Sequence, residues 1–227
     1  DDVVTKTTAG LIVLPKEHYL IKRMSRPIDD MNRIGKSACD QCSYCTEFCP
    51  RYLLGYDVQP HKVMRSLAFT TTGKEVWNQF ADLCCSCGLC SLYACPEDLY
   101  PREACNQGKD YMRKAGIKYK QKKPVSVHPM KEGRRVPINM LMKKLDLLNY
   151  YNHTPFTKEK PKPKQVKILL KQHAGAPAIS VVKEGDFVSK GDLIGNVDEN
   201  KLGAKIHASI SGKIQSVNQE FVIISSN

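Results

Sequence analysis

The chain has 227 residues and a mass of 25.6 kDa, enough for one medium-sized domain or two small domains with their own hydrophobic cores. It contains no apolar run of the roughly 18 residues that a membrane-spanning helix needs, so we predict no transmembrane segment. The formal net charge is +12, and all ten cysteines lie between positions 39 and 105.

The positive charge is concentrated in the middle of the chain. Residues 109–171 carry a net charge of +14, whereas residues 1–108 and 172–227 each carry −1. This distribution predicts two folded units joined by a cationic connector. No secretory signal is recognisable, so we expect a reducing compartment.

The run from Thr8 to Leu14 predicts a β-strand almost at the start of the chain. Because this strand follows so soon and residue 1 is not methionine, we expect a segment of a longer protein; a processed N-terminus is the alternative. A short helix is expected over 18–26, ended by Pro27.

Two cysteine runs of closely similar spacing follow. They read Cys39-x2-Cys42-x2-Cys45-x3-Cys49-Pro50 and Cys84-x2-Cys87-x2-Cys90-x4-Cys95-Pro96. In each run three thiolates of one tight loop can bind one iron–sulfur cubane, while the fourth, just before proline, points away. In bacterial ferredoxins that fourth cysteine binds the other cluster. The predicted metal ligands of two [4Fe-4S] clusters are therefore Cys39, Cys42, Cys45 and Cys95 for cluster 1, and Cys84, Cys87, Cys90 and Cys49 for cluster 2.

Zinc and disulfides explain this pattern less well. Structural zinc sites use paired C-x2-4-C units, and disulfides need an oxidising compartment. Four thiolates per cluster leave no iron open to a substrate, so we expect one-electron relay. No catalytic Ser, His, Asp grouping, no histidine in metal-ligand spacing and no G-x-G-x-x-G dinucleotide motif is apparent, so no catalytic residue is assigned.

Two features depart from the regular pattern. The second run has four residues before Cys95 where three are usual, so its loop geometry must differ. Cys85 adjoins Cys84 and could replace it, but the spacing favours Cys84. We expect Cys85 and Cys105 to be buried small hydrophobic side chains. Lys36 and Arg51 could offset cluster charge, although we expect them to be solvated.

Further helices are predicted between and after the cysteine runs. Apolar residues at helical spacing indicate helices over 61–69 and 74–83. Pro101 should open a helix that runs to about Lys114, with Gly116 as its stop, and Pro137 should open another.

The last part of the chain changes to a strand pattern. Lysine and proline dominate residues 154–165, which predicts a linker. Beyond it, short apolar runs alternate with glycines, as in a small all-β sandwich or barrel. The expected fold class is α+β, a helix-elaborated ferredoxin-like domain with two [4Fe-4S] clusters followed by a small barrel-sandwich hybrid. The predicted segments are 1–28 (first strand and connector), 29–116 (two-cluster domain), 117–165 (basic connector and linker) and 166–227 (barrel-sandwich hybrid).

Residues 181–195 resemble the turn-and-strand pattern of biotinyl and lipoyl carrier domains. A carrier needs a modifiable lysine in an exposed hairpin, and Lys201 lacks the usual flanking residues. We therefore expect a docking or assembly domain rather than a carrier.

Residues 37–51, 172–178 and 206–212 closely resemble the C-terminal half of the corrin reductases of propanediol-utilisation microcompartments, a family related to the RnfC component of the Rnf electron-transport complex. The resemblance covers essentially the whole chain. It implies an upstream half with a domain that binds FMN and NADH and a β-grasp domain, whose end and connector would be residues 1–28 and whose last strand would lie in 1–14. It also implies that electrons are delivered through both clusters to cob(II)alamin. It also implies partners, a corrinoid adenosyltransferase and a cluster-bearing shell protein, and a cytoplasmic location within a microcompartment.

We therefore hypothesise an electron-transfer module of an NADH- and FMN-dependent corrin reductase; by itself this segment would be an electron carrier. One alternative is an iron–sulfur subunit of a membrane-associated Rnf-type complex. Another makes the clusters structural and the +14 segment a surface for nucleic acid or an acidic partner. Because few aromatic side chains interleave with the lysines, we favour a solvated surface or a docking site for an acidic redox partner over nucleic acid. A third alternative is a scaffold role, in which the β domain tethers the electron relay inside an assembly.

Overall fold

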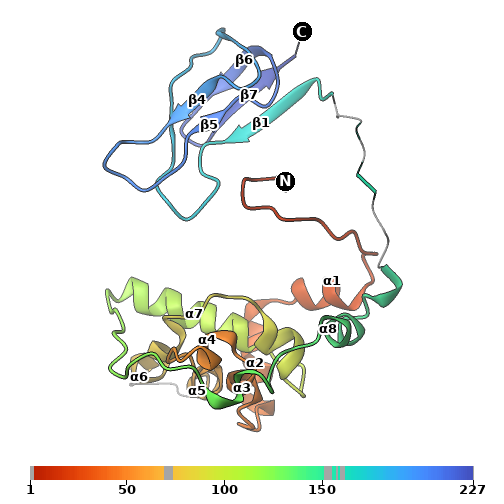
Figure 1. Ribbon diagram of the computed structural model, residues 1–227, viewed down its shortest axis with the longest axis vertical. Coiled ribbons are helices and arrows are strands. Elements are labelled where there is room, and N and C mark those ends of the chain that lie inside the picture. Colours follow the sequence, from red (N-terminus) through yellow and green to blue (C-terminus); the bar gives the residue numbers. More distant parts are fainter. Residues whose placement is uncertain (1–2, 69–73, 151–154, 157, 159–161, 227) are drawn as a thin grey trace. The chain divides into compact units, whose positions relative to one another are not determined.

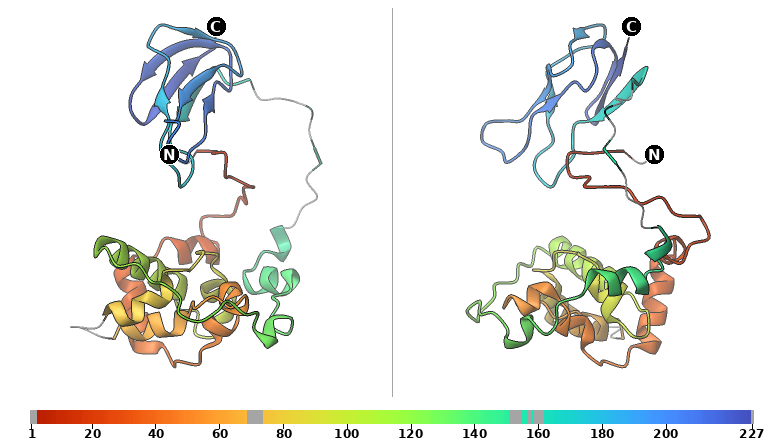
Figure 2. Two further views of the ribbon diagram at one scale, coloured as in Figure 1. Left: turned by 60° about the vertical axis from the view of Figure 1, so that its left-hand side comes forward. Right: turned by 45° about the vertical axis from the view of Figure 1, so that its right-hand side comes forward.

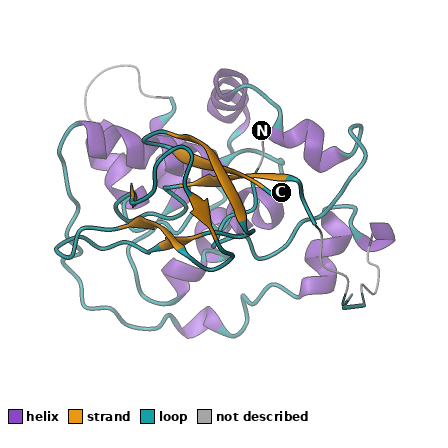
Figure 3. Cartoon of the chain, turned by 90° about the horizontal axis from the view of Figure 1, so that it is seen from above, coloured by secondary structure: helices purple, strands orange, loops and turns teal. Residues whose placement is uncertain are grey.

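The computed structural model describes the chain except for residues 1–2, 69–73, 151–154, 157, 159–161 and 227. It divides into two compact units, Leu14–His153 and Asp1–Val13 with Thr154–Asn227. The first unit is helical and the second contains the strands, so the chain is of the mixed α+β class (Figures 1 and 3). Among the described helices, none is both long and apolar enough to span a bilayer.

The helical unit consists of short helices joined by loops (Figure 2). Its α-helices are α1 (Tyr19–Met24), α2 (Ile28–Ala38), α3 (Tyr44–Glu47), α4 (Pro50–Leu53), α5 (Pro60–Ser66), α6 (Lys74–Asn78), α7 (Pro101–Lys114) and α8 (Ile138–Lys144). Single helical turns of other types are η1 (Gln79–Ala81), η2 (Cys90–Ala94), η3 (Pro129–Lys131) and η4 (Leu148–Tyr150).

Helix α7 forms the centre of this unit. Pro101 occupies its first turn, and Gly116 beyond its end has a left-handed φ of +68°. Both features confirm the predicted bounds. Its buried Ala104, Gly108 and Met112 lie four residues apart on one face, and α7 packs against α5 and α6 there.

The N-terminal part of the chain differs from the prediction. Residues 8–14 form no strand, because a strand needs a partner and none of the described strands pairs with this run. The prediction of a strand there is wrong for this structure. The helix α2 was not predicted; it begins after Pro27, carries Asp29 and Asp30 in its first turn and Lys36 in its last, and these charges favour a helix in that direction.

The second unit has two antiparallel sheets. Its strands are β1 (Gln165–Leu169), β2 (Ile179–Ser180), β3 (Phe187–Val188), β4 (Leu193–Asn196), β5 (Ile206–His207), β6 (Gly212–Val217) and β7 (Phe221–Ser225). The sheet orders are β1-β7-β6-β3 and β2-β4-β5. Both sheets face a core of nine buried side chains, including Ile194, Ile214 and Ile224. This arrangement confirms the predicted small all-β fold; the linker expected over 154–165 lies partly outside the described residues.

Two turns of this unit repeat one motif. Gly185 and Gly191 have φ of +93° and +98°, and the carboxylate of the aspartate after each glycine accepts a hydrogen bond of 2.7 Å from the backbone N–H three residues earlier. The glycines supply the left-handed conformation and the aspartates fix the turn. The carrier-like sequence pattern therefore encodes hairpin geometry.

Residues 117–128 pack closely on the helical unit at Gly55. Gly55 has a φ of +94°, and a Cβ placed there would lie 2.2 Å from the carbonyl oxygen of Ser126. The N–H of His128 donates to the carbonyl of Leu53 at 2.9 Å, which holds the same segment in place.

We therefore predict that Gly55→Ala destabilises the protein more than Gly116→Ala does. Gly116 is also left-handed but has no atom within 4 Å of such a Cβ, so its substitution should cost about 1 kcal/mol of backbone strain alone. Gly55→Ala adds a backbone clash. Thermal unfolding followed by circular dichroism at one scan rate, without oxygen, should show the larger fall in midpoint for Gly55→Ala; equal falls would contradict the packing described.

Candidate iron–sulfur site

The two cysteine loops have the same backbone conformation. The second residue after the first cysteine of each run is left-handed, with φ of 57° at both Gln41 and Ser86. The fourth residue after the first cysteine of each run is also left-handed, with φ of 62° at Ser43 and 85° at Gly88. Because this correspondence holds only if Cys84 is the counterpart of Cys39, it supports Cys84 rather than Cys85 as the first cysteine of the second loop.

The fourth cysteines also match. Cys49 has φ, ψ of −71°, 118° and Cys95 has −73°, 119°, each directly before a proline. The intervening segments differ, since α3 is an α-helical turn whereas η2 is a π-helical turn. A π turn accommodates one additional residue in a helix. The extra residue between Cys90 and Cys95 is thus absorbed in η2, and the backbone at Cys95 keeps the conformation seen at Cys49.

One group of four thiols lines a common cavity. It comprises the first three cysteines of the first run and the last cysteine of the second run: Cys39, Cys42, Cys45 and Cys95. Burial raises the pKa of the Cys45 thiol above its usual range, and the other three sulfurs add to the rise. The structure therefore brings the predicted ligands of cluster 1 together.

The thiols of the second group, Cys49, Cys84, Cys87 and Cys90, lie close enough to shift one another's pKa. Burial, with added contributions from Cys84 and Cys87 of the other loop, raises the pKa of Cys49 to about 11. Burial also raises the pKa of Cys90, and the sulfurs that add to this effect include Cys84, Cys49 and Cys87. Cys49 thus lies among the thiols of the second loop, as the crossed assignment requires. Cys45 of the first group also raises the pKa of Cys90, so the two groups are neighbours.

The donor set fits iron–sulfur clusters, because each group offers four cysteine sulfurs and soft thiolate ligands select such clusters. Among the described residues, no three His, Cys, Asp or Glu side chains gather as ligands of one ion. A cubane does not require this, since each thiolate binds a different iron. The raised pKa values mean that iron must displace protons from buried thiols when it binds.

Several donors point at the predicted ligand sulfurs. The side-chain amide of Gln41 donates to Cys39 Sγ at 3.1 Å, and the N–H groups of Ser86 and Leu99 donate to Cys84 Sγ and Cys95 Sγ at 3.3 Å each. Such hydrogen bonds stabilise thiolates and tune bound clusters.

The two remaining cysteines behave differently from each other. Cys105 in α7 is fully buried, as predicted, and its thiol donates to Cys84, which lowers the pKa of Cys84 to about 6 with help from Ser86 and Lys109. Cys85 is exposed, so the prediction that it is buried is wrong. Its thiol nevertheless interacts with that of Cys87, the next proposed ligand in the loop.

Sequence reasoning missed a buried arginine at this site. Arg23 in α1 is 8% exposed, and its guanidinium donates to the carbonyl oxygens of Ser91 at 3.0 Å and of Asp98 and Leu99 at 2.5 Å. It also lies 4.3 Å from the centroid of the Tyr100 ring. No local pattern identifies such a residue, because its partners lie 68 to 76 positions further along the chain.

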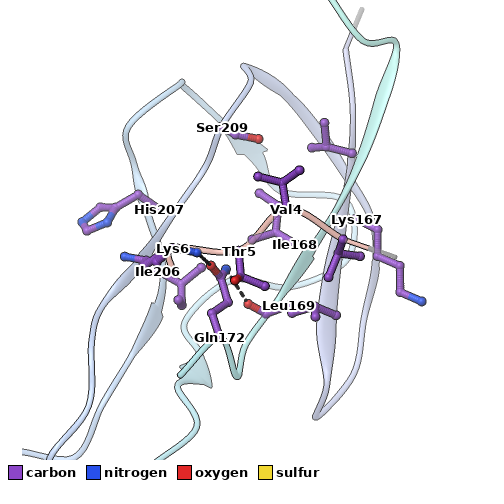
Figure 4. Close-up of a pocket in the computed structure, with 12 residues that line it drawn as sticks. Val4, Thr5, Lys6, Lys167, Ile168, Leu169, Gln172, Ile206, His207 and Ser209 are labelled. Carbon is purple, nitrogen blue, oxygen red and sulfur yellow. Dashed lines mark hydrogen bonds between the residues drawn. The ribbon is translucent and has the colours of Figure 1, made fainter. Parts of the chain in front are cut away.

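The unit that contains the strands has a hollow of its own, shown in Figure 4. Residues 3–6 line it together with β1 and β5. The N–H of Lys6 donates to Gln172 Oε1 at 3.0 Å, and Lys6 Nζ donates to the carbonyl of Lys205 at 2.7 Å. This hollow contains no thiol, so the candidate metal site lies in the helical unit.

Each of the two units contains a segment that matches a known protein family. Residues 38–100 match the family of 4Fe-4S dicluster domains, and residues 149–227 match the RnfC barrel sandwich hybrid domain.

Whole-chain relatives were found as well. The chain is 33% identical over 99% of its length to cobalamin reductase PduS of Salmonella typhimurium and 32% identical over 99% to that of Citrobacter freundii. It spans 49% of each reductase. Over 25% of its length it is 46% identical to a component of the proton-translocating ferredoxin:NAD(+) oxidoreductase complex of Clostridium ljungdahlii, of which the match covers 12%.

The loop correspondence predicts different results for two adjacent cysteines. Cys84→Ser should remove a ligand of cluster 2 and lower the iron content from about eight to about four per chain. Cys85→Ser should leave it at about eight. Iron and sulfide would be measured after anaerobic reconstitution. Loss of iron in Cys85→Ser with retention in Cys84→Ser would show that the neighbouring cysteine is the ligand.

Proposed function

Because this chain is a relative of the cobalamin reductases, with a 4Fe-4S dicluster domain followed by an RnfC barrel-sandwich hybrid domain, we propose that it is the electron-relay part of such a reductase. The single observation that carries the proposal is the crossed grouping of eight cysteines in two adjacent sets of four. We propose as ligands Cys39, Cys42, Cys45 and Cys95 for cluster 1 and Cys84, Cys87, Cys90 and Cys49 for cluster 2. When bound, each cluster would accept and release one electron at a time.

The residues of this chain would hold and insulate the relay. Cys45, Cys49, Cys90 and Cys95 are buried, whereas Cys42 and Cys87 are exposed. Each group of four therefore has one thiol at the surface and at least one in the interior. This arrangement suits electron entry at one exposed side, transfer between the buried sides, and exit at the other.

We further propose that the complete protein takes hydride from NADH onto FMN and passes single electrons through this chain to cob(II)alamin. The support is the similarity to two cobalamin reductases over 99% of this chain, which covers about half of each. A microcompartment setting, with a corrinoid adenosyltransferase and a cluster-bearing shell protein as partners, belongs to the same proposal. The domain boundaries proposed from the sequence are 29–116 for the two-cluster domain and 166–227 for the barrel-sandwich hybrid.

The basic surface favours an acidic protein partner over nucleic acid. Lys118, Lys120, Lys122 and Lys123 are exposed. Base stacking would need free aromatic rings between them. Tyr119 is the aromatic residue of this run, and its hydroxyl donates to Asp57 Oδ2 at 2.5 Å, so the ring is fixed to the folded unit.

The proposal is tested first on this chain and then on the complete protein. Anaerobically reconstituted chain should contain about eight irons, be brown, and become paramagnetic on reduction with dithionite. Stoichiometric zinc without iron would refute the relay. The complete protein should bind FMN and reduce cob(II)alamin with NADH; failure of that step alone would remove the reductase assignment and leave the relay standing.

A further inference from the structure

The π turn of η2 leaves carbonyl oxygens that two cations satisfy. The last carbonyls of a helical segment lack partners within it. Arg23 of α1 donates to the Ser91 carbonyl, and also to those of Asp98 and Leu99 in the loop that follows Cys95. Lys144 of α8 donates from Nζ to the carbonyls of Tyr93 and Cys95, at 2.9 and 3.0 Å.

Arg23 is a buried charge without a carboxylate partner. Among the described residues, no carboxylate oxygen lies within 4.0 Å of its guanidinium. Carbonyl dipoles and the Tyr100 ring compensate it only in part, and a buried cation without a counter-ion is costly. Lys144 has only a distant partner, Asp98 Oδ1 at 3.8 Å, and 31% of its side chain is exposed.

Both cations are adjacent to a proposed ligand of cluster 1. Leu99 accepts a hydrogen bond from Arg23 at its carbonyl and donates its own N–H to Cys95 Sγ. Lys144 donates to the carbonyl of Cys95 itself. A bound cluster with four thiolates carries a charge of about −2. It would be the negative group that the structure otherwise lacks beside Arg23.

The second group has cations of its own, but among the described residues Arg23 is the one arginine or lysine that is buried. Lys109 donates from Nζ to the carbonyl of Cys84 at 2.8 Å, and Arg51, two residues after Cys49, lies over the Tyr56 ring; both are only half-buried. There Arg134 lies 5.0 Å from the centroid of the Phe48 ring, next to Cys49, but it forms an ion pair of 2.5 Å with Glu47. The pair adds little net charge near Cys49. The burial of Arg23 therefore distinguishes the electrostatic surroundings of the first group from those of the second.

We propose that Arg23 and Lys144 are positioning residues that hold the Cys95 loop and raise the reduction potential of cluster 1 above that of cluster 2. This inference rests on the proposed function, because it requires both clusters. Reduction adds one electron and breaks no bond, so it adds one negative charge. Buried cations favour the more negative state, and electrons would pass from cluster 2 to cluster 1.

The test is a potentiometric titration of the full chain followed by electron paramagnetic resonance, after iron has been counted. Arg23→Met should lower the higher of the two potentials by roughly 59 mV, a tenfold change for a one-electron couple. Lys144→Met should shift the same couple less, because its side chain is partly solvated. Arg23→Lys keeps the charge and should restore most of the potential.

Two controls remove a positive charge elsewhere. Arg113→Met removes an exposed cation paired with Asp110, and Arg134→Met removes the paired cation near Cys49; neither should move the higher potential. If Arg23→Met loses iron, the higher reduction potential measured in Lys144→Met tests the inference. Full iron content with an unmoved higher potential in both Arg23→Met and Lys144→Met would overturn the inference. Absence of clusters from the unsubstituted chain would instead refute the proposed function.

Discussion

The structure depends on one geometrical requirement, that each cysteine loop contributes three thiols to one group of four and its fourth thiol to the other group. Left-handed residues at two matching positions of each loop turn the three thiols inward. The extended backbone at Cys49 and Cys95, each before a proline, carries the fourth thiol away. The core packed around Val63, Met64 and Leu99 includes Cys95 and Cys105, so the thiols and the hydrophobic core of the helical unit are one structure.

The segments outside the cysteine runs also serve this requirement. His18, just before α1, is buried, and its Nε2 lies 3.0 Å from the carbonyl of Asp146 beyond α8. The His18 ring also packs edge-on against Tyr150, with centroids 5.1 Å apart. The two ends of the helical unit thus meet, and Arg23 of α1 and Lys144 of α8 both donate to carbonyls next to or at Cys95. Residues 117–150, which carry much of the positive charge, are therefore part of the helical unit.

Patterns that depend on nearby residues could be predicted from the sequence. Pro101 and Gly116 fix α7 because a proline at the start and a left-handed glycine beyond the end are local signals. The small all-β fold was predictable from its alternating runs and Gly-Asp turns, and the cysteine spacing predicted two sets of four thiols. Features set by distant contacts were missed. Arg23 is identified only by carbonyls far along the chain, and the exposure of Cys85 and the π turn before Cys95 depend on the three-dimensional loop.

The central claim is that Cys49 and Cys95 cross between the loops and so place two clusters side by side. The most direct measurement is the electron paramagnetic resonance spectrum of the fully reduced, reconstituted chain at several microwave powers and two frequencies. Crossed ligation predicts spin–spin interaction between the clusters, seen as broadened, frequency-dependent lines and rapid relaxation. Two independent signals, each integrating to one spin with no sign of mutual interaction, would contradict it.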